Sequence, residues 1–309
     1  MAGGQHSKLW QQGGISPVAG EAVQAVHVYK KGNIRTLKPE KRRERIEKMK
    51  RVLIKKEDIK QYVFVIKELT AREIKRKYAR SSLGIIWSVL NPLLMMIVMS
   101  LIFSTMFRRS IENFPIYYLT GSILWGLFSG ATNSAMTALV DNKALLIKAK
   151  LPKHTFILSR IYTALVNLGY TCIAYALMLV VFKIKPSWAM LLLPIDVIFT
   201  LAISTGIGYV LAVMYVFFAD IKYLYSVVLR ILMYLSAIFY PISSLPEAMQ
   251  NFISCNPIYV TIAFARVCVM EGQVPEMSMW IKLICWSLIS CIVGMVCFKT
   301  KENDIMQKI

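Results

Sequence analysis

The chain has 309 residues, 56% of them hydrophobic, and it carries a formal net charge of +20. A soluble domain of this composition would expose much of its apolar surface to water, whereas a lipid bilayer accommodates it. Charge and hydrophobicity are separated along the chain, because 21 of the 37 lysines and arginines precede Leu83 and long apolar runs follow. The composition therefore excludes an ordinary soluble protein and predicts an all-α membrane protein with a basic N-terminal arm.

The arm, residues 1–50, contains glycine and glutamine and then a dense basic run. This composition favours a poorly ordered segment, which is either a solvated tail or an attachment to anionic lipid head groups. The arm holds no apolar stretch of the signal-peptide type, so we expect the later spans to direct membrane insertion. We expect membrane lipids, and no nucleic acid, among the partners.

Residues 51–83, here called the gate segment, are predicted to form an amphipathic helix. Its apolar side chains fall on one side of a helical wheel: Ile59, Tyr62, Val63, Ile66 and Leu69. Its polar side chains cluster opposite: Gln61, Glu68, Arg72 and Lys75. Such a helix, placed just ahead of the first long apolar run, is predicted to lie in the cytoplasmic membrane interface. An ordinary surface helix against a soluble partner is the alternative.

Six segments approach the roughly 20 apolar residues that a helix needs to cross a bilayer. They are residues 84–107, 116–138, 157–182, 189–217, 223–241 and 280–298, which together give a transmembrane domain over 84–298. The external segment before the last span, 242–279, is broken by Pro246, Pro257, Gly272 and Pro275. We expect short re-entrant helices there, because non-helical backbone at membrane depth is tolerated only where protein or water covers it.

The bias of lysine and arginine predicts the orientation of the spans. With the N-terminus inside, 29 of the 37 basic residues fall in the cytoplasmic segments, which are 1–83, 139–156, 218–222 and the tail 299–309. Five fall in the external segments, which are 108–115, 183–188 and 242–279. We therefore expect a multi-pass protein of the cytoplasmic (inner) membrane with both termini in the cytoplasm.

The sequence shows no pattern typical of an enzyme. It contains no G-x-x-x-x-G-K-[ST] phosphate loop, no H-E-x-x-H zinc motif and no nucleophile elbow. His6, His27 and His154 are isolated, and no cluster has the spacing of a metal site. We therefore expect no catalytic residue, no metal and no cofactor in this chain, which leaves transport or scaffolding.

A dense motif crosses the junction between the gate segment and the first span. The run from Glu68 to Pro92 resembles ABC-2 type polysaccharide-export permeases, whose pattern is roughly E-L-x-x-R-D-I-K-x-R-Y-x-x-S-x-L-G-x-x-W-x-x-x-x-P. Glu73 replaces the usual Asp, and Lys77 the usual Arg. The candidate residues of the gate helix and this motif are Ile59, Val63, Ile66, Glu68, Arg72, Glu73, Lys75, Tyr78, Ser81, Gly84, Trp87 and Pro92.

The resemblance continues in family order over about residues 55–300. Residues 142–152 are similar to the family's cytoplasmic loop between spans two and three, although Leu151 stands where Phe is common. Residues 218–221 are similar to the short loop before span five, with Ala219 in place of a frequent Arg. The external segment before the last span matches at 239–247 and at 256–257.

Members of this family are homodimers with six helices per chain, and each chain binds a separate ATPase. The resemblance therefore implies an ABC ATPase partner in two copies, which binds the ATP and Mg²⁺, and a lipid-linked glycan as the substrate. We expect the loop between spans two and three to dock on the ATPase through apolar anchors and lysines. The alternative for this loop is a positive-inside topology anchor. The candidate coupling residues are Asn142, Lys143, Leu145, Ile147, Lys148, Lys150, Pro152 and Asp220.

A sugar polymer needs a path with aromatic faces for stacking and polar edges for its hydroxyls. The aromatic candidates for this path are Tyr117, Tyr118, Trp125, Phe128, Tyr234, Phe239 and Tyr240. Each has an alternative interpretation, as a membrane-interface aromatic or as core packing. Asp196 and Arg230 are charges within predicted spans, separated by roughly 10 Å of depth, which is too far for a direct pair. Arg230 either snorkels to the cytoplasmic interface or contacts a carrier phosphate.

The sequence thus predicts the permease subunit of an ABC transporter that exports a lipid-linked polysaccharide or a teichoic-acid-type polymer. An ABC-2 permease for a drug or small lipid is the alternative within transport. A membrane-embedded glycosyltransferase or acyltransferase is the alternative from another class. That class needs membrane-facing carboxylates or histidines, which the sequence does not convincingly supply.

Overall fold

The structure is a computed structural model that describes residues 60–79, 81–103, 111–148 and 151–308. The chain divides into two compact units, residues 1–64 and 65–309. In the first unit the described residues are 60–64, and they are helical. The predicted arm over 1–50 and two candidate site residues, Ile59 and Lys150, lie outside the described residues.

The second unit is built from helices, with no strand among its described residues, so the predicted all-α class is confirmed. Its first helical stretch, residues 65–78, belongs to the gate segment. The elements that follow are α3 (Ile86–Phe103), α4 (Phe114–Asp141), α5 (Lys143–Lys148), α6 (His154–Val181), η1 (Trp188–Leu192), α7 (Leu193–Phe217), α8 (Ile221–Leu235), η2 (Ile242–Ser244), α9 (Glu247–Ser254), α10 (Pro257–Arg266), η3 (Val267–Glu271) and α11 (Met277–Lys308).

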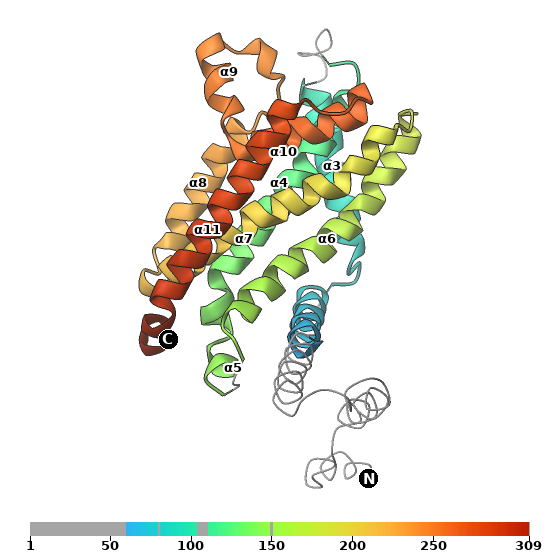
Figure 1. Cartoon of the computed structure of the whole chain (residues 1–309). Coiled ribbons are helices and arrows are strands. Elements are labelled where there is room, and N and C mark those ends of the chain that lie inside the picture. The colour runs from blue at the N-terminus through green and yellow to red at the C-terminus, as the bar shows by residue number, and fades with distance from the viewer. Residues whose placement is uncertain (1–59, 80, 104–110, 149–150, 309) are drawn as a thin grey trace, which may run out of the picture. The chain divides into compact units, whose positions relative to one another are not determined.

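Helix α4 is the centre of the second unit. It packs against α3, α6, α7 and α10, and α7 in turn packs along α11 (Figure 1). Pro115 lies in its first turn, where the missing N–H costs no helical hydrogen bond. Ala131, Ala135 and Ala138 are fully buried on α4 and let the neighbouring helices approach closely. This helix therefore carries the core against which the other elements are positioned.

The contact between α7 and α11 depends on two glycines. A Cβ atom on Gly206 of α7 would collide with the backbone of Ser290 on α11. A Cβ on Gly294 of α11 would collide with the Gly206 backbone. Small residues at facing positions let two helix backbones approach closely, a common way of joining helices inside a membrane. These glycines therefore set the spacing of the two helices.

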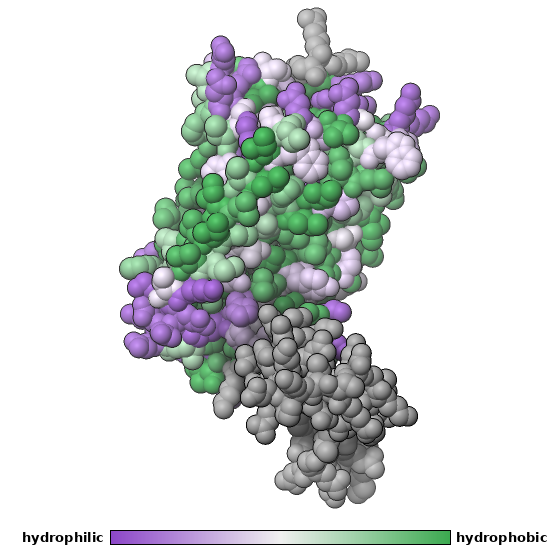
Figure 2. All heavy atoms as spheres, in the orientation of Figure 1, coloured by the Kyte–Doolittle hydropathy of each residue, from purple (hydrophilic) through white to green (hydrophobic). Residues whose placement is uncertain are grey.

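The second unit has the surface of a multi-pass membrane protein. Figure 2 shows a broad band of apolar side chains on the face in view, with hydrophilic residues gathered at its two ends. Among the described residues, five helices are long and apolar enough to cross a membrane: α3, α4, α6, η1 with α7, and α11. A sixth crossing is counted if α9 and the continuous helix formed by α10 and η3 make up one span. The chain bends by 95° between these two helices. That geometry belongs to a broken span or a re-entrant loop.

The predicted fifth span, 223–241, differs from the structure. Helix α8 has 15 residues and ends at Leu235. Its length is roughly 22 Å at 1.5 Å per residue, less than the roughly 30 Å of a bilayer core. After Ser236 the chain leaves the helix, and Ala237 adopts a left-handed backbone with φ of 47°. The apolar run at 236–241 therefore continues as a turn and not as helix.

Arg266 explains why the helix ends there. Its guanidinium donates to the carbonyl of Ala237 at 2.9 Å and to the carbonyl of Ile238 at 3.1 Å. It also lies over the Tyr117 ring, 3.4 Å from the centroid, which is a cation–π contact. The sequence predicted that Arg266 belongs to an external segment, whereas the structure buries it in the helix bundle. This buried cation supplies the donors that the non-helical carbonyls need.

The second unit has two ends, named here by the short helix at each. The α5 end holds α5, the start of α6 and the last turns of α11, which Lys153 joins by donating to the carbonyl of Glu302 (Figure 1). The α9 end holds α9 and the start of α4. Helices α3, α4, α6 and α7 run in alternating directions between these ends, and the chain returns to the α9 end through α8 before α11 begins.

Candidate functional site

A groove of about 950 Å³ lies between residues 73–78 of the gate segment and helices α3, α4 and α6. Along α4 its wall runs from Ser134 to Tyr118, roughly 24 Å of helix at 1.5 Å per residue. The bilayer core is roughly 30 Å thick, so the groove follows α4 over most of that depth. It begins at the charged residues Glu73 and Arg160, toward the α5 end.

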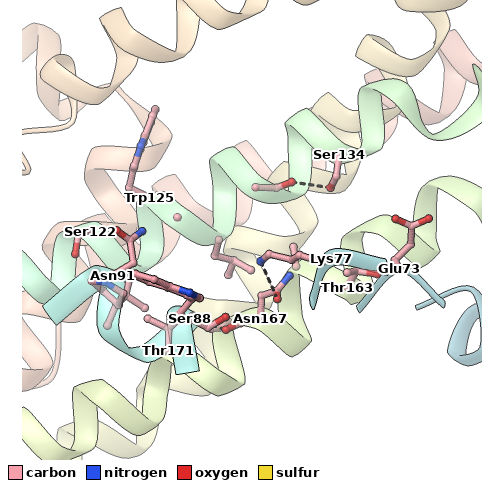
Figure 3. A pocket seen from close by; sticks show the side chains of 18 of the residues that line it. Glu73, Lys77, Ser88, Asn91, Ser122, Trp125, Ser134, Thr163, Asn167 and Thr171 are labelled. Carbon is pink, nitrogen blue, oxygen red and sulfur yellow. Dashed lines mark hydrogen bonds between the residues drawn. The ribbon is translucent and has the colours of Figure 1, made fainter. Parts of the chain in front are cut away.

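The wall of the groove is rich in hydroxyl, amide and aromatic groups. Figure 3 shows polar side chains from three helices facing one another: Ser88 and Asn91 of α3, Ser122 of α4, and Asn167 and Thr171 of α6. Aromatic side chains in the same wall are Tyr78, Trp87, Tyr118 and Trp125. Hydroxyls and amides can bond sugar hydroxyls, and aromatic faces can stack on sugar rings. The groove therefore has the chemistry that a glycan path requires.

The polar side of α6 follows the period of a helix. Arg160, Thr163, Asn167 and Thr171 all line the groove and are spaced by three or four residues. One helix face carries these positions, while the other faces of α6 are largely apolar. The apolar character of 157–182 predicted a span but did not reveal any of these four residues as a groove residue. Their spacing is the signal that could have identified them.

A charge cluster closes the groove toward the α5 end. Arg160 donates to Glu73 of the gate segment at 2.5 Å and to Asp141 at the end of α4 at 2.9 Å. The side chains of Arg160 and Glu73 are 8% and 10% exposed, so this pair is largely shielded from water. Arg76 adds a bond to Glu73 at 2.8 Å from a more exposed position. The cluster ties the gate segment to α4 and α6.

A second contact joins the gate segment to residues 142–152, the predicted ATPase-docking loop between α4 and α6, here called the coupling loop. Arg72 donates to the side-chain oxygen of Asn142 at 2.5 Å. The Asn142 amide nitrogen donates to the carbonyl of Ala138 at 2.8 Å and so continues the end of α4. Thr70 adds a bond to the carbonyl of Ser159 at 3.2 Å. Two of the predicted residues, Arg72 from the gate motif and Asn142 from the coupling loop, therefore meet in space.

The end of the gate motif forms a tight turn into α3. The Gly84 N–H donates to the Ser81 hydroxyl at 3.0 Å, and Gly84 has φ of +50°, which favours glycine. The Tyr78 and Ser88 hydroxyls are hydrogen-bonded to each other across the turn. Lys77 donates to Asn167 at 3.3 Å, inside the groove (Figure 3). The motif thus shapes the groove wall where the gate segment meets the first span.

The other gate residues divide by exposure. Glu68, Arg72 and Lys75, on the predicted polar arc, are exposed, whereas Leu69 of the apolar arc is buried. Ile66 is half-buried and Val63, in the first unit, is 46% exposed. Trp87 and Pro92 of α3 line the groove.

The predicted coupling residues lie at or near the α5 end. Helix α5 presents Lys143, Ile147 and Lys148 to solvent, and Ile147 is 61% exposed. Leu145, predicted as an apolar anchor, packs against the hydrophobic core. Pro152 is half-buried and Asp220, before α8, is exposed. Among the described residues of this loop, Ile147 is therefore the large apolar side chain that is exposed and available for a partner.

The predicted path residues do not form one surface. Tyr118 and Trp125 line the groove, whereas Phe128 is buried in the core against Trp125 at 5.9 Å between ring centroids. The remaining candidates gather near the α8–η2 turn. Tyr117 donates to the carbonyl of Tyr240 at 2.8 Å, Tyr240 donates to the carbonyl of Tyr234 at 2.6 Å, and Phe239 is buried against Tyr118 and Tyr234. Arg230 is exposed on α8, with no ion pair among the described residues.

Comparisons with known proteins agree with this geometry. The sequence model of the family described as ABC-2 type transporter matches residues 65–270. The O-antigen export system permease protein RfbA of Myxococcus xanthus is 26% identical over 254 residues, covering 82% of this chain and 98% of that protein. The polysialic acid transport protein KpsM of Escherichia coli is 24% identical over 255 residues, covering 78% and 95%. The capsule polysaccharide export inner-membrane protein CtrC of Neisseria meningitidis serogroup A is 24% identical over 244 residues, covering 75% and 88%.

Proposed function

The chain belongs to the ABC-2 type transporter family, and on this premise we propose that it is the permease subunit of an exporter for a lipid-linked polysaccharide or teichoic-acid-type polymer. The observation that carries the substrate class is the groove, whose wall combines the polar stripe of α6 with aromatic side chains. The similar proteins named for O-antigen, polysialic acid and capsule export support the same class. They favour a glycan over a drug or small lipid, and transport over a transferase reaction.

In this proposal the α5 end faces the cytoplasm and both termini lie there. The basic side chains support it: Lys143, Lys148, Lys153, Lys222, Lys299 and Lys301 belong to loops and helix ends on that side. The gate segment meets the bundle at the same end through Arg160, and α11 finishes there beside Lys153. An excess of lysine and arginine on the cytoplasmic side is the general rule for membrane proteins.

A separate ABC ATPase, in two copies, supplies the energy in this proposal and binds the ATP and Mg²⁺. The chain itself acts as a homodimer. Helix α5 is the proposed docking element, because Ile147 offers an exposed apolar anchor between Lys143 and Lys148. Asn142, directly ahead of α5, is bonded to Arg72 of the gate segment at 2.5 Å. Movement of the loop would therefore be transmitted to the gate segment, which borders the groove.

The groove is the proposed entrance for the glycan. Lys77 and Arg76 place positive charge at its mouth, where a carrier phosphate would lie at the level of the lipid head groups. Asn91, Asn167 and Ser122 lie deeper along the wall and offer hydrogen bonds to hydroxyls. The apolar carrier chain would remain in the bilayer, in contact with the exposed apolar side chains of α3.

The test of the proposal is a clean deletion of the gene in its own host. We expect surface polymer to fall and lipid-linked glycan to accumulate on the cytoplasmic side, and the wild-type gene should restore both. Normal surface polymer, in a strain with no second exporter, would contradict the proposed substrate. A loss of resistance to a small compound with normal surface polymer would indicate the drug or small-lipid alternative.

A further inference from the structure

Asp196 is a buried acid that neither the groove nor the coupling loop uses. It lies in the first turn of α7 and is 0% exposed. Neither of its side-chain oxygens has a hydrogen-bond partner among the described residues, and it belongs to no ion pair there. Its backbone carbonyl accepts a bond from the Thr200 hydroxyl at 3.0 Å. A carboxyl group without partners inside a membrane domain is rare and costly.

The Asp196 side chain lines a small cavity of about 80 Å³ between α4, α6, α7 and α10. The wall is mainly apolar and includes Ile123, Leu168 and Val197. Its other polar groups are the hydroxyls of Thr120 and Tyr175, which are hydrogen-bonded to each other at 2.6 Å. This volume exceeds the 10–15 Å³ or so that one water molecule needs. Its accessible wall is nevertheless almost entirely apolar, and the two Asp196 carboxyl oxygens have almost no accessible surface.

No cation among the described residues faces Asp196 closely enough to neutralise it. From α6 the titratable groups at the cavity are Tyr175 and Cys172, and from η3 the Cys268 thiol lies near enough for an ionised Asp196 to act on it electrostatically. The buried cation of the region, Arg266 of α10, is engaged by the carbonyls of Tyr117, Ala237 and Ile238. The charge of an ionised Asp196 would therefore be left unpaired in an apolar setting.

Two occupants could remove that charge, a proton or a small metal cation. Hard cations such as Ca²⁺ take six to eight oxygen ligands, and Mg²⁺ requires six in near-octahedral geometry. The cavity offers the carboxyl of Asp196 and the two hydroxyls of Thr120 and Tyr175, and the rest of its wall is apolar. A proton needs one oxygen of the carboxyl and leaves a neutral group, which costs far less to bury than a carboxylate.

We propose that Asp196 and its cavity form a proton-binding site inside the membrane domain. A hydronium ion gives one proton to the carboxylate, which leaves a neutral carboxylic acid and one water molecule. The water molecule returns to the solvent. In this conformation Asp196 is neutral, and a conformation in which it is ionised has to admit more water between α4, α6, α7 and α10.

The site therefore links protonation to the packing of four helices. A higher pH favours conformations that hydrate the cavity, because they bind one proton fewer. This inference does not depend on the identity of the exported substrate. It follows from the burial, the missing partners and the cavity alone.

Infrared spectroscopy of the purified protein in lipid nanodiscs tests the proposal directly. We expect a C=O stretching band of a protonated carboxylic acid at neutral pH, which shifts in D₂O and is absent from the Asp196→Asn variant. Glu247→Gln, which alters an exposed carboxylate on α9, should leave the band unchanged. Biosynthetic labelling with ¹³C-aspartate should move the band in the wild-type protein, which assigns it to an aspartate even if the Asn variant folds poorly. Among the described residues, Asp196 is the buried aspartate.

The outcomes separate cleanly. A band that moves with labelled aspartate and is lost in Asp196→Asn supports the proton site. If the wild-type spectrum instead shows Asp196 as a carboxylate at neutral pH, the proposal is overturned. A band identical in wild type and Asp196→Asn, and unmoved by labelled aspartate, overturns it as well. Each result is independent of export activity, so it cannot be confused with a failure of the proposed function.

Discussion

Arg160→Met should break the charge cluster that ties the gate segment to α4 and α6. The change leaves the Glu73 carboxylate, whose side chain is 10% exposed, without its partner at 2.5 Å. It also removes the bond from Arg160 to Asp141 at 2.9 Å. Removing one member of a buried ion pair typically costs about 3–5 kcal/mol. Glu73 keeps its bond to Arg76, so we expect a cost at the lower end of this range. We expect the purified variant to unfold at a clearly lower temperature, as followed by tryptophan fluorescence in detergent.

The chain supplies matched controls for this experiment. Arg76 also contacts Glu73, at 2.8 Å, but its side chain is 63% exposed, so Arg76→Met should cost less than about 1 kcal/mol. The double variant Glu73→Leu with Arg160→Met removes both buried charges and should regain most of the lost stability. Equal unfolding temperatures for Arg160→Met and Arg76→Met would refute the reasoning. So would a double variant that is no more stable than Arg160→Met.

Three further changes test the other parts of the account. Ile147→Asp should reduce co-purification of the partner ATPase, because burial of an isoleucine side chain in an interface contributes about 1.5–3 kcal/mol to the binding free energy. Ile147→Val keeps an apolar side chain and should bind the ATPase normally. Gly206→Ala should destabilise the protein by about 1–3 kcal/mol, because the added methyl group would collide with the α11 backbone. Gly169→Ala should not, because there is open space around the Gly169 Cα, and thermal unfolding measures both variants. Asn167→Leu should lower export of surface polymer in cells while ATPase binding is unchanged, because it removes an amide from the groove wall and not from α5.

The sequence alone predicts where the long helices lie. Runs such as 116–138 and 189–217 are apolar over the full length of a span, and α4 and α7 lie where these runs predict. The prolines of the external segment also mark real boundaries, since Pro246 precedes α9 and Pro257 begins α10. Local composition determines these features, because a helix long enough to cross a bilayer satisfies its own backbone hydrogen bonds.

The end of α8 could not be predicted in this way. Residues 236–241 are apolar enough to continue the helix, yet the carbonyls of Ala237 and Ile238 are bonded to Arg266, about 30 residues later in the chain. The close approach of α7 and α11 is a similar case. Nothing in the local sequence distinguishes Gly206 and Gly294 from other glycines, and their role depends on the fold that places them opposite each other. Both features depend on contacts between distant segments, which a local pattern does not contain.

The candidate site was predicted in part. The gate motif identified Glu73, Tyr78 and Trp87, all of which line the groove. The motif did not reveal that Glu73 is paired with Arg160, because the partner lies 87 residues away within an apolar run. Aromatic character alone did not separate groove residues from core residues either. Trp125 lines the groove, whereas Phe128, one turn further along α4, is buried.

The proposed function requires this chain to move a lipid-linked glycan across the membrane. Transport can be measured in inside-out vesicles that contain the chain and its partner ATPase, with labelled lipid-linked glycan in the outer leaflet. We expect ATP to make the glycan resistant to an added glycosidase, and we expect Asn167→Leu to slow this protection. Glycan that stays fully cleavable while ATP is hydrolysed would contradict the proposed function.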